Sequence, residues 1–434
     1  MKVNEKLKKL KHVKNISYIF VGKIVSMFLY QVYDIIIARK LNVQDYGEWA
    51  YFFSILNIFF FVGWFGVNSA ARVYVSKANT SIEREKYVKA AFVVRFVISC
   101  VVTSLFVIFA KRMALQFGYP EKYPNLLWLF YFSGFIIFIN SYTDLFKNLF
   151  QAIENFELLA IVSVLEYTGY LVFAIVFLNV LPSVKSVAIA YLTAGVVVIV
   201  FSILKHNKRE SKLYQSVDWS CVKEIFYYAL PMLVLSIGAI VLAEIDIIML
   251  GMLGTRQDVS LYSIGKRLCD KAIHVNEAIV VGTVGTLAVI NKDNLREKYI
   301  QFKKFSLLNA LATCCTAILL VLLAIFFIPM LYGEEYARAS QVTIMIIPYY
   351  ILFGISYLCV RVLDFHGRVW IRSIWFLVVI GIDIVLNFFL IPVLGAYGAA
   401  IATWISLVPY TIYTMQAIRK WFKIQFKNSE ISNQ

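Results

Sequence analysis

The sequence predicts an all-α polytopic membrane protein with about twelve transmembrane helices in two parallel six-helix lobes around a central cavity. Three observations lead to this fold class: an excess of apolar residues, apolar runs of membrane-spanning length, and an internal repeat. Of the 434 residues, 61% are hydrophobic, and the mean hydropathy is +0.74. Soluble domains contain roughly 45–50% apolar residues. The core of a soluble protein could not bury so large a share of apolar residues.

Apolar runs of about 20 residues, long enough to cross roughly 30 Å of hydrocarbon as a helix, recur along the whole chain between short charged loops. We expect twelve spans, at about 16–38, 48–68, 88–110, 125–147, 157–179, 185–204, 225–250, 260–290, 305–330, 341–362, 370–391 and 397–417. The first follows the basic tail MKVNEKLKKLKHVKN. The eighth has the weakest hydropathy signal, because its first half contains the charged stretch GKRLCDKAIHVNE at 265–277.

Three pairs of similar segments recur in the same order in both halves. YDIIIARKL at 33–41 matches IDIIMLGML at 245–253, GYPEKY at 118–123 matches YGEEY at 332–336, and NVLPSVKSVAIAYLTAG at 179–195 matches FLIPVLGAYGAAIATWIS at 389–406. We therefore predict a first lobe at 1–210, a cytoplasmic linker at 211–224, and a second lobe at 225–434 with a basic cytoplasmic tail. An even number of spans per lobe makes the repeats parallel, and in such transporters the substrate site lies between the halves.

The loops determine the predicted orientation, because Lys and Arg concentrate on the cytoplasmic side. With the N-terminus inside, cytoplasmic segments carry 29 Lys and Arg residues and outer loops carry 8. The net charge of +16 then reflects mainly basic loops that face anionic lipid, and does not indicate nucleic-acid binding. Both termini are expected in the cytoplasm.

Five basic residues lie inside the predicted spans and away from their ends: Lys23, Arg95, Lys266, Arg267 and Lys271. Charge at membrane depth is tolerated when it faces a protein interior or a watery cavity. Arg267 and Lys271 are one helical turn apart and repel each other unless an anion lies between them. Lys266 with Asp270, and Asp270 with His274, have the spacing of hydrogen-bonded pairs along a helix. We interpret the five basic residues as a binding site for an anionic substrate; local ion pairs and snorkelling side chains are the alternative.

Acidic residues inside the spans are candidates for ion coupling, because a carboxylate in low dielectric titrates nearer neutral pH. The acidic residues inside the spans are Asp34, Glu166, Glu244, Asp246, Asp270, Glu277 and Asp383, of which the first six are the named candidates. Each of them can instead pair with one of the basic residues. No cofactor is expected apart from a coupled proton or sodium ion. No Cys or His spacing suggests a metal site, and no nucleophile and base pair or phosphate-binding glycine loop suggests an enzyme.

The segment DIIIARKLNVQDYGEWAYFFSILNIFFFVGWFGVNSAARVY at 34–74 resembles the opening of the Wzx-type polysaccharide flippases of the multidrug/oligosaccharidyl-lipid/polysaccharide exporter superfamily. These typically show ARxLG followed by YG after the first helix. Ala38, Arg39, Leu41 and Tyr46-Gly47 fit this pattern, and Asn42 replaces the usual glycine. EIDIIMLGMLGTRQDVSLYSIGKRL at 244–268 and IPVLGAYGAAIATWIS at 391–406 are similar to later parts of the family. The resemblance covers nearly the whole chain.

The resemblance implies a flippase of the bacterial plasma membrane. Its substrate would be a polyprenyl-diphosphate-linked oligosaccharide, moved from the cytoplasmic to the outer leaflet by alternating access for O-antigen, capsule or exopolysaccharide synthesis. The basic residues would bind the diphosphate. Aromatic residues would stack on sugars, with Tyr30, Trp64, Tyr167 and Tyr170 as candidates. Membrane lipids are further expected partners. The polysaccharide polymerase and the chain-length machinery are candidate partners that act in the same synthesis.

Two other functions remain open from the sequence. Cation-coupled multidrug antiporters belong to the same superfamily, but their largely cationic substrates would not favour a basic cavity. A membrane polysaccharide polymerase or ligase usually needs a substantial outer loop, and the longest one predicted here is 111–124. The related lipid II flippases have fourteen helices, two more than this sequence predicts.

The loop charges generate a topology prediction. A reporter enzyme that works only in the cytoplasm should be active when fused after Lys208 or Arg296, and inactive within the loop 111–124. Activity in that loop would overturn the predicted orientation.

Overall fold

The computed structural model describes residues 2–64, 66–207, 217–287, 290, 294–367 and 369–431. The described part contains helices and no strand. Two compact units follow each other along the chain, Met1–Ile240 and Val241–Gln434, and each is described here by itself. This arrangement confirms the predicted all-α, two-lobe fold class.

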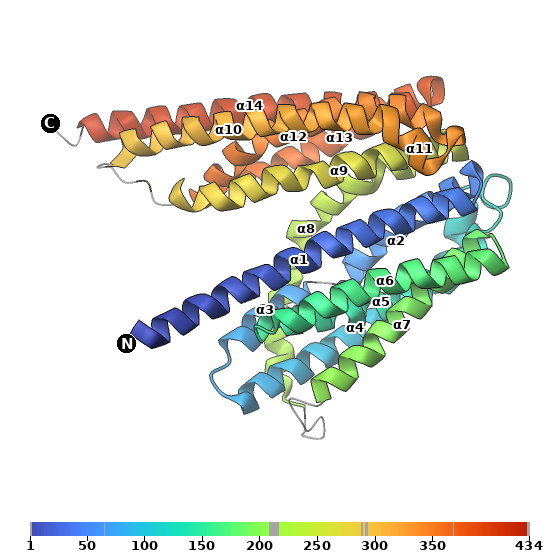
Figure 1. The fold of residues 1–434 in the computed structure, drawn as a ribbon, viewed down its shortest axis with the longest axis horizontal. Coiled ribbons are helices and arrows are strands. Elements are labelled where there is room, and N and C mark those ends of the chain that lie inside the picture. Colours follow the sequence, from blue (N-terminus) through green and yellow to red (C-terminus); the bar gives the residue numbers. More distant parts are fainter. Residues whose placement is uncertain are drawn as a thin grey trace. The chain divides into compact units, whose positions relative to one another are not determined.

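The first unit contains α1 to α7 and the first part of α8 (Figure 1). The helices are α1 (Lys2–Lys40), α2 (Val43–Trp64), α3 (Val67–Lys77), α4 (Ser81–Gln116), α5 (Leu126–Ala152), α6 (Phe156–Val180), α7 (Val184–Asn207) and α8 (Trp219–Leu253). Side chains of α1 before residue 17 lie outside the described part. The predicted second span is divided into α2 and α3, and Gly66 at the break has a φ of 68°. A residue with a side chain rarely adopts that conformation.

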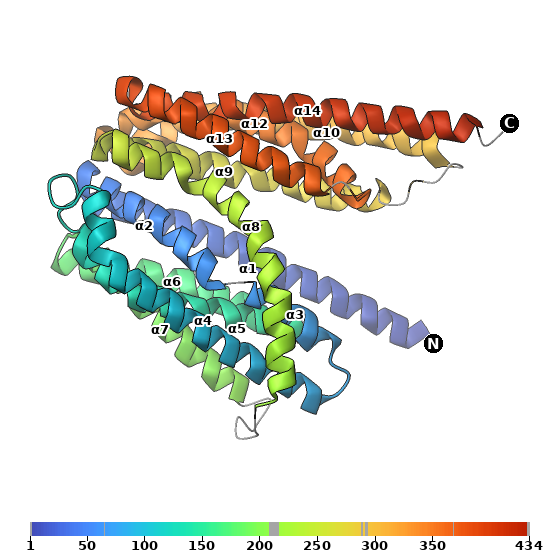
Figure 2. The same ribbon diagram turned by 180° about the vertical axis from the view of Figure 1, so that it is seen from behind.

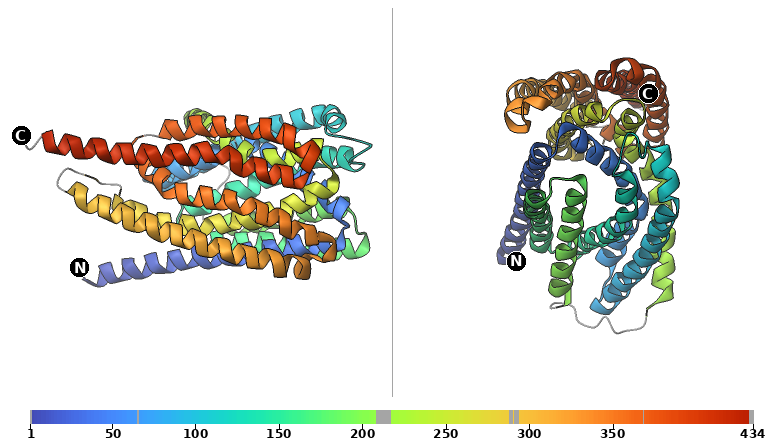
Figure 3. Two further views of the ribbon diagram at one scale, coloured as in Figure 1. Left: turned by 90° about the horizontal axis from the view of Figure 1, so that it is seen from above. Right: turned by 90° about the vertical axis from the view of Figure 1, so that its right-hand side faces the viewer.

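The second unit contains the rest of α8 and the helices that follow it (Figure 2). They are α9 (Arg256–Val284), η1 (Gly285–Leu287), α10 (Leu295–Leu322), η3 (Leu323–Phe327), α11 (Ile328–Tyr332), η4 (Glu334–Tyr336), α12 (Ala337–Phe365), α13 (Val369–Leu394) and α14 (Ala396–Ile431). Segment η3 is a π-helical turn that continues α10. Helix α14 is 36 residues long and runs to the C-terminal end in Figure 3.

Every predicted span coincides with a helix or a broken helix. Nine helical segments in the described ranges are long and apolar enough to cross a membrane. The other three predicted spans correspond to α8, α9 and α14. Helix α9 carries too many charges to qualify by composition, as expected from its sequence. Its charged side chains must be accommodated by protein contacts or by water.

The two units use the same packing scheme. In the first, α5 contacts α2, α4 and α7, and α7 contacts α6. In the second, α12 contacts α9, α10 and α14, and α14 contacts α13. The fourth span of each lobe therefore occupies the centre of its bundle. This correspondence supports the internal repeat seen in the sequence.

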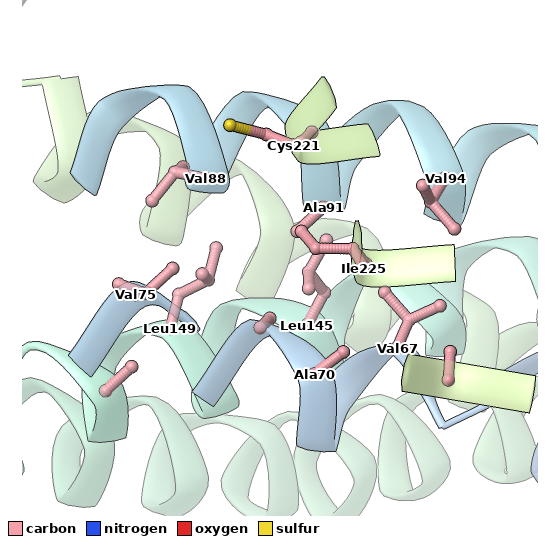
Figure 4. Close-up of a cluster of buried hydrophobic side chains, with 14 of the residues drawn as sticks. Val67, Ala70, Val75, Val88, Ala91, Val94, Leu145, Leu149, Cys221 and Ile225 are labelled. Atoms are coloured by element: carbon pink, nitrogen blue, oxygen red, sulfur yellow. The ribbon is translucent and has the colours of Figure 1, made fainter. Parts of the chain in front are cut away.

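The first part of α8 packs with the first unit. Cys221, Ile225 and Ala229 of α8 join an apolar cluster with residues of α3, α4 and α5, including Val67 and Leu145 (Figure 4). The unit boundary consequently falls inside α8, whereas the sequence interpretation places it in the charged linker 211–224. Residues 208–216 of that linker lie outside the described part.

Polar contacts hold the start of α8 beside α4. Lys86 donates to Asp218 at 3.1 Å, and the Tyr87 hydroxyl donates to Glu224 at 2.8 Å. The hydrogen bond from Lys86 keeps the pKa of Asp218 below its ordinary value. Both contacts are partly exposed to solvent, so they contribute to orientation more than to stability.

Candidate functional site

Helix α9 begins at a complete capping box. The Thr255 hydroxyl accepts from the backbone N–H of Asp258, and the Asp258 carboxylate accepts from the backbone N–H of Thr255. The Asp258 carboxylate also accepts from the N–H of Ala396 at 3.2 Å, which ties the start of α14 to the start of α9. This double anchor fixes the residue at which α9 begins and holds that end beside the start of α14.

Lys266 enters the interior of the second unit. Its ammonium group donates to Oδ2 of Asp246 on α8 at 3.1 Å, and the two side chains are 5% and 1% exposed. The same ammonium lies 5.6 Å from the ring of Tyr349 and 5.9 Å from that of Tyr262. A buried ion pair is tolerated only when further hydrogen bonds replace lost hydration.

Those further hydrogen bonds come from α9 itself and from two other helices, α13 and α14. The Tyr262 hydroxyl of α9 donates to Oδ2 of Asp246 at 2.7 Å, and Thr403 of α14 lies 3.2 Å from the same oxygen. Asn387 of α13 donates to Oδ1 of Asp246 at 3.0 Å. The helices α8, α9, α13 and α14 therefore meet at one carboxylate.

A second buried carboxylate, Asp383, adjoins this pair. The Asn387 amide donates to Asp383 at 3.0 Å as well as to Asp246, and Asp383 is 2% exposed. Its Oδ1 has no hydrogen-bond partner among the described residues. We call Asp246, Lys266, Asp383, Asn387 and Thr403 the second-lobe polar cluster. It contains two carboxylates and one ammonium group.

The first unit contains a related but simpler arrangement at Asp34, the repeat partner of Asp246. Asp34 is 1% exposed, and the hydroxyl of Tyr46 lies 3.1 and 3.2 Å from its two oxygens. In both lobes a tyrosine from the following helix thus donates to a buried aspartate of the first span.

A second polar centre of the first unit surrounds Glu166 of α6. Lys147 of α5 donates to Glu166 at 3.0 Å and pairs with Asp144 at 2.7 Å, while the Tyr170 hydroxyl donates to Glu166 at 3.0 Å. Tyr170 also stacks on Tyr191 of α7, with ring centroids 4.4 Å apart. The sequence identifies Glu166 but not Lys147, because the predicted span ends at 147 while α5 continues to Ala152.

The other predicted site residues have different environments. Arg267, Asp270 and Lys271 are half-buried on α9, and Glu244 is half-buried on α8. Lys23 on α1 is exposed. The structure therefore brings Lys266 and Asp246 together, and leaves Arg267 and Lys271 one turn apart at the partly exposed side of the same helix.

Arg95 lies at the break between α2 and α3. It is 0% exposed and donates to the carbonyl of Gly63 at 2.6 Å and to the side chain of Asn68. Gly63 is in the last turn of α2, where carbonyls lack helical partners. Arg95 therefore bridges the two halves of a broken membrane helix.

Two pairings suggested by helical spacing differ in the structure. Lys266 binds Asp246 on another helix, whereas the spacing suggests Asp270. His274 contacts Glu277 at 2.7 Å, whereas the spacing suggests Asp270. In both cases the side chain reaches a carboxylate that lies closer than the one at i±4.

The sequence did not single out several members of the polar clusters. They are Tyr262, Asn387 and Thr403 in the second unit, and Asp144 and Lys147 in the first. Asp383 and Asn387 are one helical turn apart within a strongly apolar run, which is a usable signal. A hydroxyl or amide in a helix is otherwise too common to indicate a site. No group of three or more His, Cys, Asp and Glu residues suited to a metal ion occurs in the ranges described above.

Comparisons with known proteins agree with this architecture. The family described as polysaccharide biosynthesis protein matches residues 36–341, well over half of the chain. A search of the curated proteins finds no significant match. The following likenesses to solved structures concern the fold alone, because sequence identity is low.

One similar solved structure is an inward-facing multidrug resistance MATE family transporter of the MOP superfamily. Its TM-score is 0.73 at 13% identity, with 94% of this chain and 99% of that chain covered. Another is the lipid II flippase MurJ in an inward closed conformation, with a TM-score of 0.73 at 15% identity over 95% of this chain and 90% of that chain. An outward-facing MATE transporter has a TM-score of 0.61 at 14% identity, covering 95% and 96%.

The buried ion pair generates a stability prediction. Lys266→Met should lower the free energy of unfolding by about 3–5 kcal/mol, because Asp246 would remain buried without its counter-ion. The double variant Asp246→Asn/Lys266→Met should recover part of this loss. Thermal unfolding in detergent, followed by intrinsic fluorescence, measures both effects.

The exposed pair Lys86–Asp218 provides a control, since its side chains are 45% and 32% exposed. Lys86→Met should cost about 0–1 kcal/mol. Equal effects of Lys86→Met and Lys266→Met would contradict a structural role for the buried pair.

Proposed function

Because the chain belongs to the polysaccharide biosynthesis protein family, we propose that it is a flippase for a polyprenyl-diphosphate-linked oligosaccharide. Export in polysaccharide biosynthesis and a transporter fold follow from the family and the architecture. The proposal adds the lipid-linked substrate, its movement to the outer leaflet by alternating access, and a role in O-antigen, capsule or exopolysaccharide synthesis. It also adds a bacterial plasma-membrane location with both termini in the cytoplasm.

One observation carries the choice of an anionic substrate: the different surroundings of the three cations on α9. Lys266 is buried and already neutralised by Asp246 at 3.1 Å. Arg267 and Lys271 are half-buried, one turn apart, and deep within a 29-residue helix. Partly exposed charge at such a depth requires an aqueous surface. A diphosphate there could accept charge-assisted hydrogen bonds from both side chains.

Arg267 and Lys271 would have different tasks at such a site. The planar guanidinium of Arg267 can hold two phosphate oxygens at once, whereas the Lys271 ammonium acts as a compact charge. Lys266 would contribute indirectly, by fixing the rotation of α9. Arg95 and Lys23 are weaker candidates, because Arg95 holds the α2–α3 break and Lys23 lies exposed on α1.

A multidrug antiporter is the second candidate, and the likeness to MATE transporters favours it at the level of fold. Two half-buried cations on α9 would repel a largely cationic drug. The carboxylates most suited to a cation, Asp246 and Asp383, are 1% and 2% exposed and too enclosed for a drug-sized molecule. These features favour an anionic substrate, and transport assays with both substrate classes distinguish the two functions.

We further propose that the second-lobe polar cluster couples transport to a proton or a sodium ion. Asp246 and Asp383 place two carboxylates beside the single ammonium of Lys266, so a bound proton or small cation would balance the remaining charge. Oδ1 of Asp383 lacks a hydrogen-bond partner among the described residues and is the position such an ion would use. Oxygen atoms of Asp383 and Thr403 are ligands that hard cations prefer.

Among the other acidic candidates, Glu166 is the strongest, because it forms a comparable centre with Lys147 and Asp144. Asp34 is bound by Tyr46, and Glu277 by His274 and Tyr357. Asp270 and Glu244 are half-buried and less enclosed.

The substrate proposal predicts a loss of export. Arg267→Ala and Lys271→Ala should each lower polysaccharide export about tenfold or more, because hydrogen bonds to charged groups contribute about 1.5–3 kcal/mol. Arg267→Lys should restore only part of the rate, since a point charge lacks the planar fork. Surface polysaccharide in a deletion strain complemented with each variant measures the rate.

Membrane protein levels must stay normal in these variants. Lys304→Ala, which removes an exposed basic residue of α10 in the same unit, serves as the control and should export normally. Normal export by the double variant Arg267→Ala/Lys271→Ala would refute the anion site.

The coupling proposal predicts that transport in proteoliposomes depends on an imposed proton or sodium gradient. Asp383→Asn should remove this dependence, because the amide cannot bind a proton or balance a cation. Glu335→Gln, at an exposed acidic residue, should retain it. Gradient-independent transport by the unmodified protein would make Asp246 and Asp383 structural residues only.

A further inference from the structure

Helix α12 carries an aromatic ladder beside the charged face of α9. Tyr349, Phe353 and Tyr357 follow one another at intervals of four residues, with ring centroids 6.0 and 5.7 Å apart. All three rings are only partly buried. The next residue at this interval, Arg361, places its guanidinium 5.0 Å from the Tyr357 ring. The ladder is about 12 Å long from Tyr349 to Tyr357.

Polar side chains of α9 border this ladder. The Tyr357 hydroxyl donates to Glu277 at 3.3 Å and accepts from Arg361 at 2.8 Å, and His274 contacts the other oxygen of Glu277 at 2.7 Å. The side chains of His274, Glu277 and Arg361 are 43%, 37% and 42% exposed. At the other end, the Lys266 ammonium lies 5.6 Å from the Tyr349 ring.

Close helix packing makes the ladder and its border one surface. A Cβ atom on Gly265 of α9 would lie 2.7 Å from Oγ1 and 3.2 Å from the backbone N of Thr343 on α12. The two helices can approach this closely only because Gly265 has no side chain. Both helices belong to the second unit, where they run side by side (Figure 1).

This surface suits neither lipid nor a closed core. Hydrocarbon would leave the charged groups of His274, Glu277 and Arg361 without hydration, and a core would bury the rings completely. Rings beside hydrogen-bonding groups with fixed positions match a sugar instead. The apolar C–H face of a pyranose can rest on an aromatic ring, while its hydroxyls reach a carboxylate and an imidazole.

We propose that the α9–α12 surface formed by Tyr349, Phe353, Tyr357, His274, Glu277 and Arg361 binds the sugar residues of the transported oligosaccharide. This inference rests on the proposed function and assigns the glycan a site separate from Arg267 and Lys271. A neutral or anionic sugar is favoured over a cationic aromatic drug, because Arg361 already occupies the cation–π position over Tyr357.

Glycan binding can be measured apart from diphosphate binding. The probe is free oligosaccharide, released by mild acid from the lipid-linked pool of a strain that lacks this protein. Saturation-transfer NMR and titration with the purified full chain in lipid nanodiscs should detect binding without any diphosphate. Phe353→Leu and Tyr357→Leu should each weaken it about threefold to tenfold, as expected for loss of one aromatic contact.

Two further variants separate binding from helix stability. Tyr357→Phe keeps the ring and removes the hydroxyl that links Glu277 to Arg361, so it should bind more tightly than Tyr357→Leu. Phe389→Leu removes a ring of α13 that is 66% exposed in the same unit, and should bind normally.

Three results would overturn the inference. They are absent binding of the free oligosaccharide, unchanged binding by Phe353→Leu and Tyr357→Leu, or competition by a cationic aromatic dye for the same rings. Each leaves the proposed flippase function standing if export still requires Arg267 and Lys271. If export did not require Arg267 and Lys271 while the free oligosaccharide still bound, only the proposed diphosphate site would be refuted.

Discussion

The buried ion pair between Lys266 and Asp246 organises the second lobe. Taking an ammonium and a carboxylate out of water is costly, and their attraction offsets this cost only when the remaining hydrogen-bonding capacity is filled. Tyr262, Asn387 and Thr403 fill it, and they come from α9, α13 and α14. The requirement to satisfy one carboxylate therefore fixes the rotation of α9 within its bundle. Every other charged residue of that helix takes its direction from this rotation.

Helix α9 consequently serves different tasks on different sides. Lys266 points inward, while Arg267 and Lys271 are half-buried, and His274 and Glu277 border the aromatic ladder of α12. Successive side chains differ by about 100° around a helix, so neighbours in sequence enter different surroundings. A structural ion pair, a proposed diphosphate site and a proposed glycan site can thus share one helix. The charged stretch 265–277 is accommodated because no single environment has to accept all of it.

The two lobes show how a repeat keeps its packing while its polar content diverges. The fourth span is central in both, and a tyrosine binds the aspartate of the first span in both. In the second lobe Lys266 pairs with that aspartate, and in the first lobe Lys147 pairs with Glu166 of another span. Apolar packing depends on the shape and spacing of helices, which the repeat preserves. Buried charges depend on individual partners, so each lobe balances them in its own way.

The sequence by itself determined the membrane class, the helical spans, the two-lobe repeat and the charged stretch of α9, because hydropathy and helical period are local properties of a chain. It also identified Asp246 and Lys266 as unusual, since charge is rare inside an apolar run. Only the tertiary structure decided their partners. Asn387 and Thr403 lie 141 and 157 residues from Asp246 in sequence, and no local pattern brings them together. The helical spacing of Lys266 and Asp270 suggested the wrong partner for the same physical reason. A buried ammonium pairs with the carboxylate that helix packing brings close to it, whatever their separation in sequence.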